Sequence, residues 1–196
     1  MFKDLHELNG IHLAPYMEVA TALIGKKRHA GGNMFRHQVD TMSILIDYGY
    51  IDSILLKASL VHDVIEDIPN FDVNRLLDIE PEAKEVHKLV LEVTKQKDQS
   101  KDDFLRRIAW EGSERAKILK CADRISNMIA LGYVTDSEFI ERYCEETECF
   151  IFPIASIVND DMYEELLWLT RTRSKYLEDS GYLEATYTKQ IEDVVD

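Results

Sequence analysis

The feature that most constrains this chain is the run Leu60–Asp67, in which an apolar helix ends in one histidine and three carboxylates. A helix that buries the aliphatic residues of this run has no packing role for His62 and Asp63. Burying an unpaired charge is costly or forces the group to become neutral. A divalent cation would remove that cost, because it would accept both side chains as ligands and neutralise the carboxylate. For these two residues alone, a charge pair at a helix end is the more common explanation, so a metal site requires further ligands elsewhere.

Further ligands are available in two other helical segments. His37 lies 25 residues before His62, and Asp123 lies 60 residues after Asp63, with Asn127 one turn further on the same face. Two imidazoles and two carboxylates form a mixed nitrogen and oxygen set, which suits Mn²⁺ or Fe²⁺ better than a closed structural zinc site. Mg²⁺ and Zn²⁺ are the remaining alternatives. Four protein ligands on an octahedral ion leave room for water and a phosphate oxygen, which predicts a hydrolase.

Three blocks of sequence extend this pattern: His62–Asp67, Leu89–Lys95 and Lys120–Met128. Together with His37, and over roughly residues 15 to 131, they resemble the hydrolase domain of RelA/SpoT-type alarmone enzymes, a branch of the HD-domain metal-dependent phosphohydrolases. The resemblance implies an all-α, multi-helix HD-domain bundle. It also implies manganese-dependent removal of the 3'-pyrophosphate from guanosine tetra- or pentaphosphate, which yields GDP or GTP and pyrophosphate.

The resemblance also implies roles for individual residues. The implied metal ligands are His37, His62, Asp63 and Asp123. The implied acidic pair at the attacking water is Glu66 and Asp67, and Asn127 is the implied residue near the nucleotide. Glu66 and Asp67 follow Asp63 by three and four positions, which places them one turn further along the same side of a helix.

Two departures from the family pattern leave the substrate open. Gln38 follows His37 where the family usually has proline, and the segment before His37 is shorter, with Lys26–Gly32 as its nearest equivalent. One alternative is an HD phosphohydrolase that acts on a deoxynucleotide, a nucleoside monophosphate or a cyclic nucleotide. Another is a non-catalytic helical module that binds a nucleotide or a protein partner. Nothing resembling a synthetase or regulatory domain follows, so we expect hydrolysis alone.

The expected chemistry is metal-assisted hydrolysis of a phosphoanhydride or phosphoester. The metal would lower the pKa of a bound water, and the acidic pair would orient that water or accept its proton. Lys27, Arg28 and Arg124 would neutralise charge on the leaving pyrophosphate. The simpler explanation for Lys27 and Arg28 is charge complementarity at a helix end, and for Asp123 and Arg124 it is a surface location. However, Asp123 lies at the edge of a buried apolar stripe, which favours a ligand.

The chain of 196 residues is predicted to form a single HD-type domain, with a core of about residues 13–180 and an acidic tail over 181–196. Its net charge of −14 argues against general nucleic-acid binding and repels a polyphosphate at long range, so local positive charge must attract the substrate. Three cysteines without a CxxC pair, no signal peptide and no long apolar run indicate a cytoplasmic protein that does not enter a membrane. Each cysteine is expected to be a small buried hydrophobic residue. The sequence does not indicate an oligomeric state.

Apolar residues recur at helical spacing along the whole chain, and no useful alternating strand pattern is present. Residues 1 to 12 are expected to form a loose start with at most one short turn. The first helix is expected to run from Pro15 to the basic Lys26–Arg28 and to stop at Gly31-Gly32. The second is expected to cover about Met34 to Tyr48.

Cap residues define several later helices. Asp52 and Ser113 are expected N-caps, and Ser100 with Asp103 forms a capping-box variant. A kink is expected at Pro153, and Asp160 or Asp161 is expected to cap the last helix. His87 lacks a neighbouring carboxylate motif, so we expect a surface or half-buried histidine and not a ligand.

Overall fold

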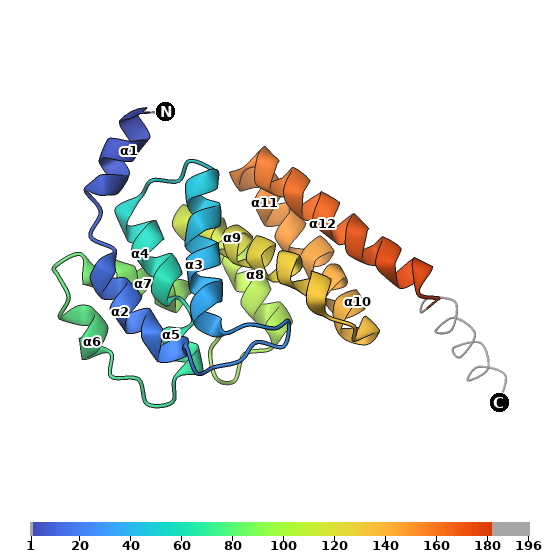
Figure 1. The fold of residues 1–196 in the computed structure, drawn as a ribbon, viewed down its shortest axis with the longest axis horizontal. Helices are drawn as coiled ribbons and strands as arrows, with labels where there is room; N and C mark the ends of the chain where they lie inside the picture. The colour runs from blue at the N-terminus through green and yellow to red at the C-terminus, as the bar shows by residue number, and fades with distance from the viewer. Residues whose placement is uncertain (1, 182–196) are drawn as a thin grey trace.

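The computed structural model describes residues 2–181, and this part of the chain is α-helical (Figure 1). Its helices are α1 (Phe2–Asn9), α2 (Ala14–Ala20), α3 (Met34–Asp47), α4 (Ser53–Val61), α5 (Val64–Asp67), α6 (Asn74–Leu77), α7 (Ala83–Val93), α8 (Lys101–Glu111), α9 (Glu114–Ala130), α10 (Ser137–Glu146), α11 (Phe152–Val158) and α12 (Asp160–Asp179). Shorter helical turns are η1 (Thr21–Leu23), η2 (Leu131–Tyr133) and the π-helical η3 (Thr147–Ile151). The predicted all-α fold is confirmed. The predicted acidic tail beyond Gly181 lies outside the described residues.

Helix α9 lies at the centre of the bundle. It packs against α3, α4 and α7 on one side and against α11 and α12 on the other (Figure 1). Most of its residues are buried, including the charged Lys120, Asp123 and Arg124. Charged side chains are almost never buried without partners. The position of these three residues in the core therefore requires polar contacts from the neighbouring helices. No helix in the described range is both long and apolar enough to cross a bilayer.

Side-chain caps fix where the central helices begin. The side chains of Asp52, Ser100 and Ser113 each accept a hydrogen bond from the backbone amide three residues later, as the sequence predicts. The last helix differs, because Asn159 caps α12 by accepting from the Met162 amide. The prediction of Asp160 or Asp161 as this cap was wrong by one or two residues: in the structure both aspartates lie inside the first turn, where their negative charges interact favourably with the helix dipole.

The segment before α3 corrects two expectations. Residues 2–9 form α1, although they were expected to be loose. The next helix stops at Ala20 and continues only as η1, so Lys26–Arg28 belong to a loop and not to a helix end. The Lys26 carbonyl accepts from the Met34 amide, and Gly31 and Gly32 turn the chain with φ angles of 84° and 72°. Glycine adopts this left-handed backbone without steric cost, so the glycine pair makes a tight turn here instead of ending a helix.

The chain around Pro153 is more irregular than a simple kink. The π-helical η3 separates α10 from α11, and Pro153 lies in the first turn of α11, where a missing amide proton costs no helix bond. Cys121 and Cys144 are buried as expected, but Cys149 in η3 is exposed, so that expectation was wrong for one cysteine. His87 is half-buried, in agreement with the prediction, and burial lowers its pKa.

A buried ammonium group on α4 connects this helix to the segment before α7. The Lys57 side chain is 4% exposed and contacts carboxylate oxygens of both Glu80 and Glu82. Tyr16 from α2 donates a hydrogen bond of 3.0 Å to Glu80. Hydrogen bonds from Lys57 and Ser53 lower the pKa of Glu82. This cluster therefore contributes stability that is present above about pH 4.5 and lost as the pH falls through the lowered pKa.

Replacing Lys57 tests the energetic role of this cluster. Because Lys57→Met leaves two carboxylates without their cation, we expect the free energy of unfolding to fall by about 2–3 kcal/mol at pH 7, less than for a fully buried pair because both glutamates are partly solvated. Arg115→Met removes the exposed pair with Asp52 and should cost less than about 1 kcal/mol. Urea unfolding at pH 7 and pH 4 measures both variants. Equal destabilisation of the two variants would contradict the assignment.

Candidate metal centre and its cavity

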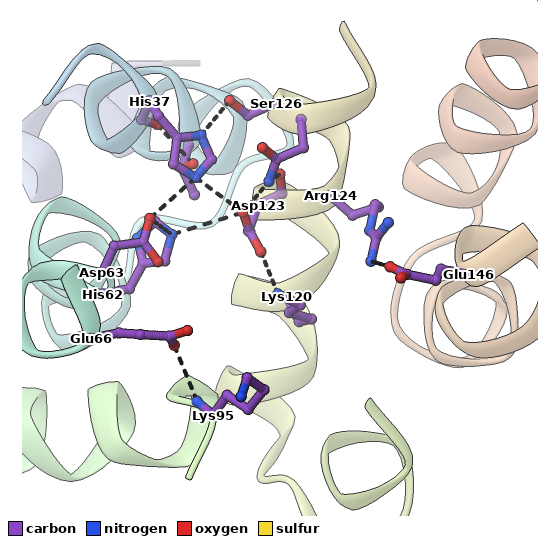
Figure 2. A network of polar contacts seen from close by, with 12 residues as sticks. His37, His62, Asp63, Glu66, Lys95, Lys120, Asp123, Arg124, Ser126 and Glu146 are labelled. Atoms are coloured by element: carbon purple, nitrogen blue, oxygen red, sulfur yellow. Dashed lines mark hydrogen bonds and ion pairs between the residues drawn. The ribbon is translucent and has the colours of Figure 1, made fainter. Parts of the chain in front are cut away.

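Three helical segments bring the expected metal ligands together (Figure 2). His37 lies in the first turns of α3, His62 and Asp63 form the junction between α4 and α5, and Asp123 lies in the middle of α9. At the junction the chain leaves the helix after Val61 and starts a new one at Val64. This break lets His62 remain buried while Asp63 points into the space between the helices.

The distances between these side chains are those of one cluster. The Nε2 atom of His37 lies 3.0 Å from Oδ1 of Asp123 and 3.5 Å from Oδ2 of Asp63. The Nε2 atom of His62 lies 3.3 Å from Oδ2 of Asp63 and 3.9 Å from Oδ1 of Asp123. Ligand atoms of His37, His62 and Asp123 all lie within 4.8 Å of one another, which is close enough for a shared cation.

Hydrogen bonds on the far side of each imidazole direct its Nε2 atom to the cluster. The His62 Nδ1 atom lies 2.8 Å from the Ser59 carbonyl, which can only accept, so Nδ1 carries a proton and donates it. The His37 Nδ1 atom lies 2.9 Å from the Ser126 hydroxyl. Such bonds hold metal-ligating histidines in the correct tautomer. The buried Nε2 atom of His62 has no hydrogen-bond partner among the described residues. These donors therefore fit a divalent cation.

The electrostatics of the cluster favour an added positive charge. Burial lowers the pKa of His62, but the negative charges of Asp63 and Asp123 outweigh this effect and raise it to about 9. Burial opposes ionisation of Asp123, yet Lys120 and the two imidazoles hold the pKa of this carboxyl well below its usual value. Both shifts show that the protein keeps negative charge at a buried position, which a cation would neutralise directly.

The four side chains of the cluster line a cavity of about 200 Å³. Glu66 and Asp67 line one wall, and the Glu66 carboxylate accepts a hydrogen bond of 3.2 Å from the Lys95 amide (Figure 2). Lys95, Lys101 and Lys120 also line this cavity. The site therefore combines a metal-ligand set, an acidic pair and several cations, which together suit the binding of an anionic substrate.

A second cavity of about 310 Å³ adjoins the first and contains the basic loop. The residues that line both cavities are Met34, Asp67, Asn127 and Tyr143. Lys27 and Arg28 line the second cavity, and Arg28 donates a hydrogen bond of 2.8 Å to the Asn127 side chain. Lys26 forms an ion pair with Asp67. The loop cations that the sequence singled out therefore lie beside the acidic pair and Asn127.

Arg124 does not line either cavity. It lies on the opposite side of α9 from the metal ligands, with its guanidinium over the Tyr143 ring at 4.1 Å and next to Glu146 at 3.4 Å (Figure 2). The expectation that Arg124 binds substrate is therefore corrected, because successive helix residues differ by about 100° in direction. Its side chain is 1% exposed, so the alternative of a surface charge is also wrong.

Several residues of the site were not identified from the sequence. Lys120 precedes Asp123 by one turn and contacts its Oδ2 atom at 2.5 Å, a spacing that could have suggested the pair. Lys101 has no comparable sequence signal, because it reaches the cavity from α8. Gln38 was noted only as a departure from a family pattern, yet it is buried and contacts Asp63.

Known proteins resemble this chain in sequence and in fold. Proteins named GTP pyrophosphokinase rsh from Brucella ovis and Brucella abortus are each 31% identical over 153 residues, which cover 72% of this chain. A solved structure described as a metazoan ortholog of SpoT that hydrolyzes ppGpp and plays a role in starvation responses is 25% identical, with a TM-score of 0.68. That match covers 82% of this chain and 96% of the solved one. The predicted resemblance to the RelA/SpoT-type HD domain is confirmed.

The extent of these matches differs. The RelA/SpoT-like chain spans 20% of the length of the Brucella relatives but nearly all of the solved structure. No family profile matches the chain. The Brucella relatives therefore share part of their sequence with this chain, and the solved structure shares its fold.

Metal binding can be tested without a substrate. We expect Mn²⁺ to raise the melting temperature of the metal-stripped protein, because a ligand that binds the folded state stabilises it. Asp63→Ala should weaken Mn²⁺ binding by more than about 100-fold, since even partners of ligands contribute about 10–100-fold. Isothermal titration calorimetry with MnCl₂ measures both effects.

A second histidine provides the control for this experiment. His87→Ala removes a half-buried histidine on α7 that does not line the site, and it should bind Mn²⁺ as the wild type does. Wild-type affinity in Asp63→Ala would exclude Asp63 as a ligand.

Proposed function

We propose that this chain is a metal-dependent phosphohydrolase that removes the 3'-pyrophosphate from guanosine tetra- or pentaphosphate. The products are GDP or GTP and pyrophosphate. The observation that carries the proposal is the convergence of His37, His62, Asp63 and Asp123 beside a cavity that also holds an acidic pair. The solved structure that shares this fold is described as hydrolyzing ppGpp, which supports the choice of substrate.

The proposed ligand set indicates the metal, and the cysteines indicate the compartment. Two imidazoles and two carboxylates favour Mn²⁺, with Fe²⁺, Mg²⁺ and Zn²⁺ as weaker candidates. When bound, the cation would acidify a water molecule and polarise a phosphoryl oxygen. The three free thiols are compatible with the reducing cytoplasm, where we place the activity.

The two members of the acidic pair, Glu66 and Asp67, have different roles in this proposal. Glu66 is exposed at the cavity, and its carboxylate is oriented by the Lys95 amide, so it orients the attacking water and accepts its proton. The water oxygen bonds to phosphorus, the bond from phosphorus to the ribose 3'-oxygen breaks, and that oxygen takes up a proton. Asp67 is paired with Lys26, and it fixes the basic loop against the cavity.

The cations bind the substrate from two sides. Lys27 and Arg28 lie in the adjoining cavity, where Asn127 connects the loop to α9 through hydrogen bonds to Arg28 and to Asp123. Lys101 contacts the phosphates from the opposite side. These local cations counter the long-range repulsion from a net charge of −14, because a charge at contact distance is screened far less than distant ones.

A nucleotide panel with Mn²⁺, with and without chelator, tests the proposal. We expect guanosine tetraphosphate to give GDP and pyrophosphate, and the chelator to abolish this reaction. Glu66→Gln should bind Mn²⁺ normally and reduce kcat by about 10²–10⁴-fold, the contribution typical of a general base.

Results with the other nucleotides of the panel distinguish the alternative functions. Turnover of a deoxynucleotide, nucleoside monophosphate or cyclic nucleotide, with none of guanosine tetraphosphate, would reassign the substrate. Absence of bound metal and of turnover for every nucleotide would instead support a non-catalytic binding module.

Replacing Lys101 tests whether this side chain contacts the phosphates of the substrate. It lines the cavity, is exposed there, and makes no ion pair or hydrogen bond within the described range. A hydrogen bond to a charged group is worth about 1.5–3 kcal/mol. Lys101→Ala should therefore lower kcat/KM by at least about 10-fold, measured in steady-state kinetics.

Lys97→Ala is the matched control for this variant. Lys97 is an exposed lysine of the preceding loop that does not line the cavity, so its removal should leave kcat/KM unchanged. Equal effects of the two variants would indicate a general electrostatic contribution instead of a phosphate contact.

A further inference from the structure

The residue after the first histidine of the cluster is a buried amide. Gln38 lies on α3 next to His37 and is 0% exposed. Burying an amide without hydrogen bonds is unfavourable, so a glutamine at this position requires polar partners. The helix does not need it, because its side chain forms no cap and no bond within α3. The partners come instead from the α4–α5 junction.

Both ends of the Gln38 amide face the same residue. Its Nε2 atom donates to Oδ2 of Asp63 at 2.8 Å, and its Oε1 atom lies 3.5 Å from the Asp63 backbone amide. The same Oδ2 atom lies 3.3 Å from Nε2 of His62 and 3.5 Å from Nε2 of His37. Gln38 therefore holds the Asp63 carboxylate beside both imidazoles.

Asp63 needs such a partner more than Asp123 does. The Asp123 side chain is 9% exposed and contacts Lys120 and Asn127 in addition to the imidazoles. The Asp63 side chain is 24% exposed and lies at a break between two helices. A carboxylate in that position has room to rotate towards solvent, and each rotation away from the imidazoles would remove a ligand.

We propose that Gln38 is a positioning residue that sets the affinity of the metal centre by fixing Asp63. The proposal rests on the proposed metal centre but not on which nucleotide is hydrolysed. Hydrogen bonds that orient metal-binding carboxylates typically contribute 10–100-fold in metal affinity. An amide is suited to this task because it adds no charge to the site and can contact the backbone and the side chain of Asp63 together.

The test measures metal binding by the whole chain, with MnCl₂ alone as the probe. Gln38→Met keeps the length of the side chain but removes both hydrogen bonds, and we expect the Kd for Mn²⁺ to rise by about 10-fold. Gln38→Asn is one methylene shorter and should show a similar rise. Circular dichroism melting of each metal-free variant establishes that it is folded.

The matched control is Tyr16→Phe. Tyr16 is also fully buried, and the substitution removes its one hydrogen bond, to Glu80, but Tyr16 lies outside the metal cluster. This variant should melt at a lower temperature and bind Mn²⁺ with wild-type affinity. A structural role for Gln38 would produce the same pattern in Gln38→Met, and that result would overturn the proposal.

A measurement on the wild type remains decisive if the variants do not fold. The side-chain amide protons of Gln38 should exchange slowly with solvent in NMR spectra, whereas those of the exposed Gln96 should exchange rapidly. Binding of diamagnetic Zn²⁺ should shift the Gln38 signals and leave those of Gln96 in place. Rapid exchange at Gln38, or signals that do not respond to Zn²⁺, would overturn the proposal.

Because no nucleotide is present, failure of the proposed hydrolysis in a separate activity assay leaves this result unaffected.

Discussion

The structure depends on the burial of one carboxylate, Asp123, in the middle of the central helix. A buried carboxylate is tolerated only where charges and hydrogen bonds replace water. Here these partners come from α9 itself, through Lys120 and Asn127, and from the histidines of two other segments. The cluster therefore constrains how α3, the α4–α5 junction and α9 pack. The same arrangement that neutralises Asp123 also assembles the candidate site.

The local parts of this architecture could be read from the sequence. Helix starts at Asp52, Ser100 and Ser113 were predictable because a cap bonds to an amide three residues away, and no distant residue is needed. The metal ligands were accessible for a different reason. His62 and Asp63 follow an apolar run, where their burial would be costly without a cation, and the spacing of the blocks resembles a known family.

The parts that were missed depend on contacts across the fold. The pair Gly31-Gly32 is equally compatible with a helix stop and with a tight turn, and backbone bonds across the loop, such as the one between Lys26 and Met34, select the turn. Arg124 is adjacent to a ligand in sequence, but it points to α10 because of helix geometry. Lys101 reaches the cavity because α8 packs near α9, a tertiary relation that composition and periodicity do not contain.

The two carboxylates of the cluster differ in how firmly they are held, and this difference bears on how the site works. Asp123 is fixed from several directions within the core, whereas Asp63 belongs to a short junction that continues directly into Glu66 and Asp67 on α5. A shift of this junction would move the ligand Asp63 and the acidic pair together. The position of Asp123 is therefore set by the buried centre of the bundle, whereas the positions of Asp63 and the acidic pair also depend on the polar contacts of Gln38 with Asp63 and of Lys26 with Asp67.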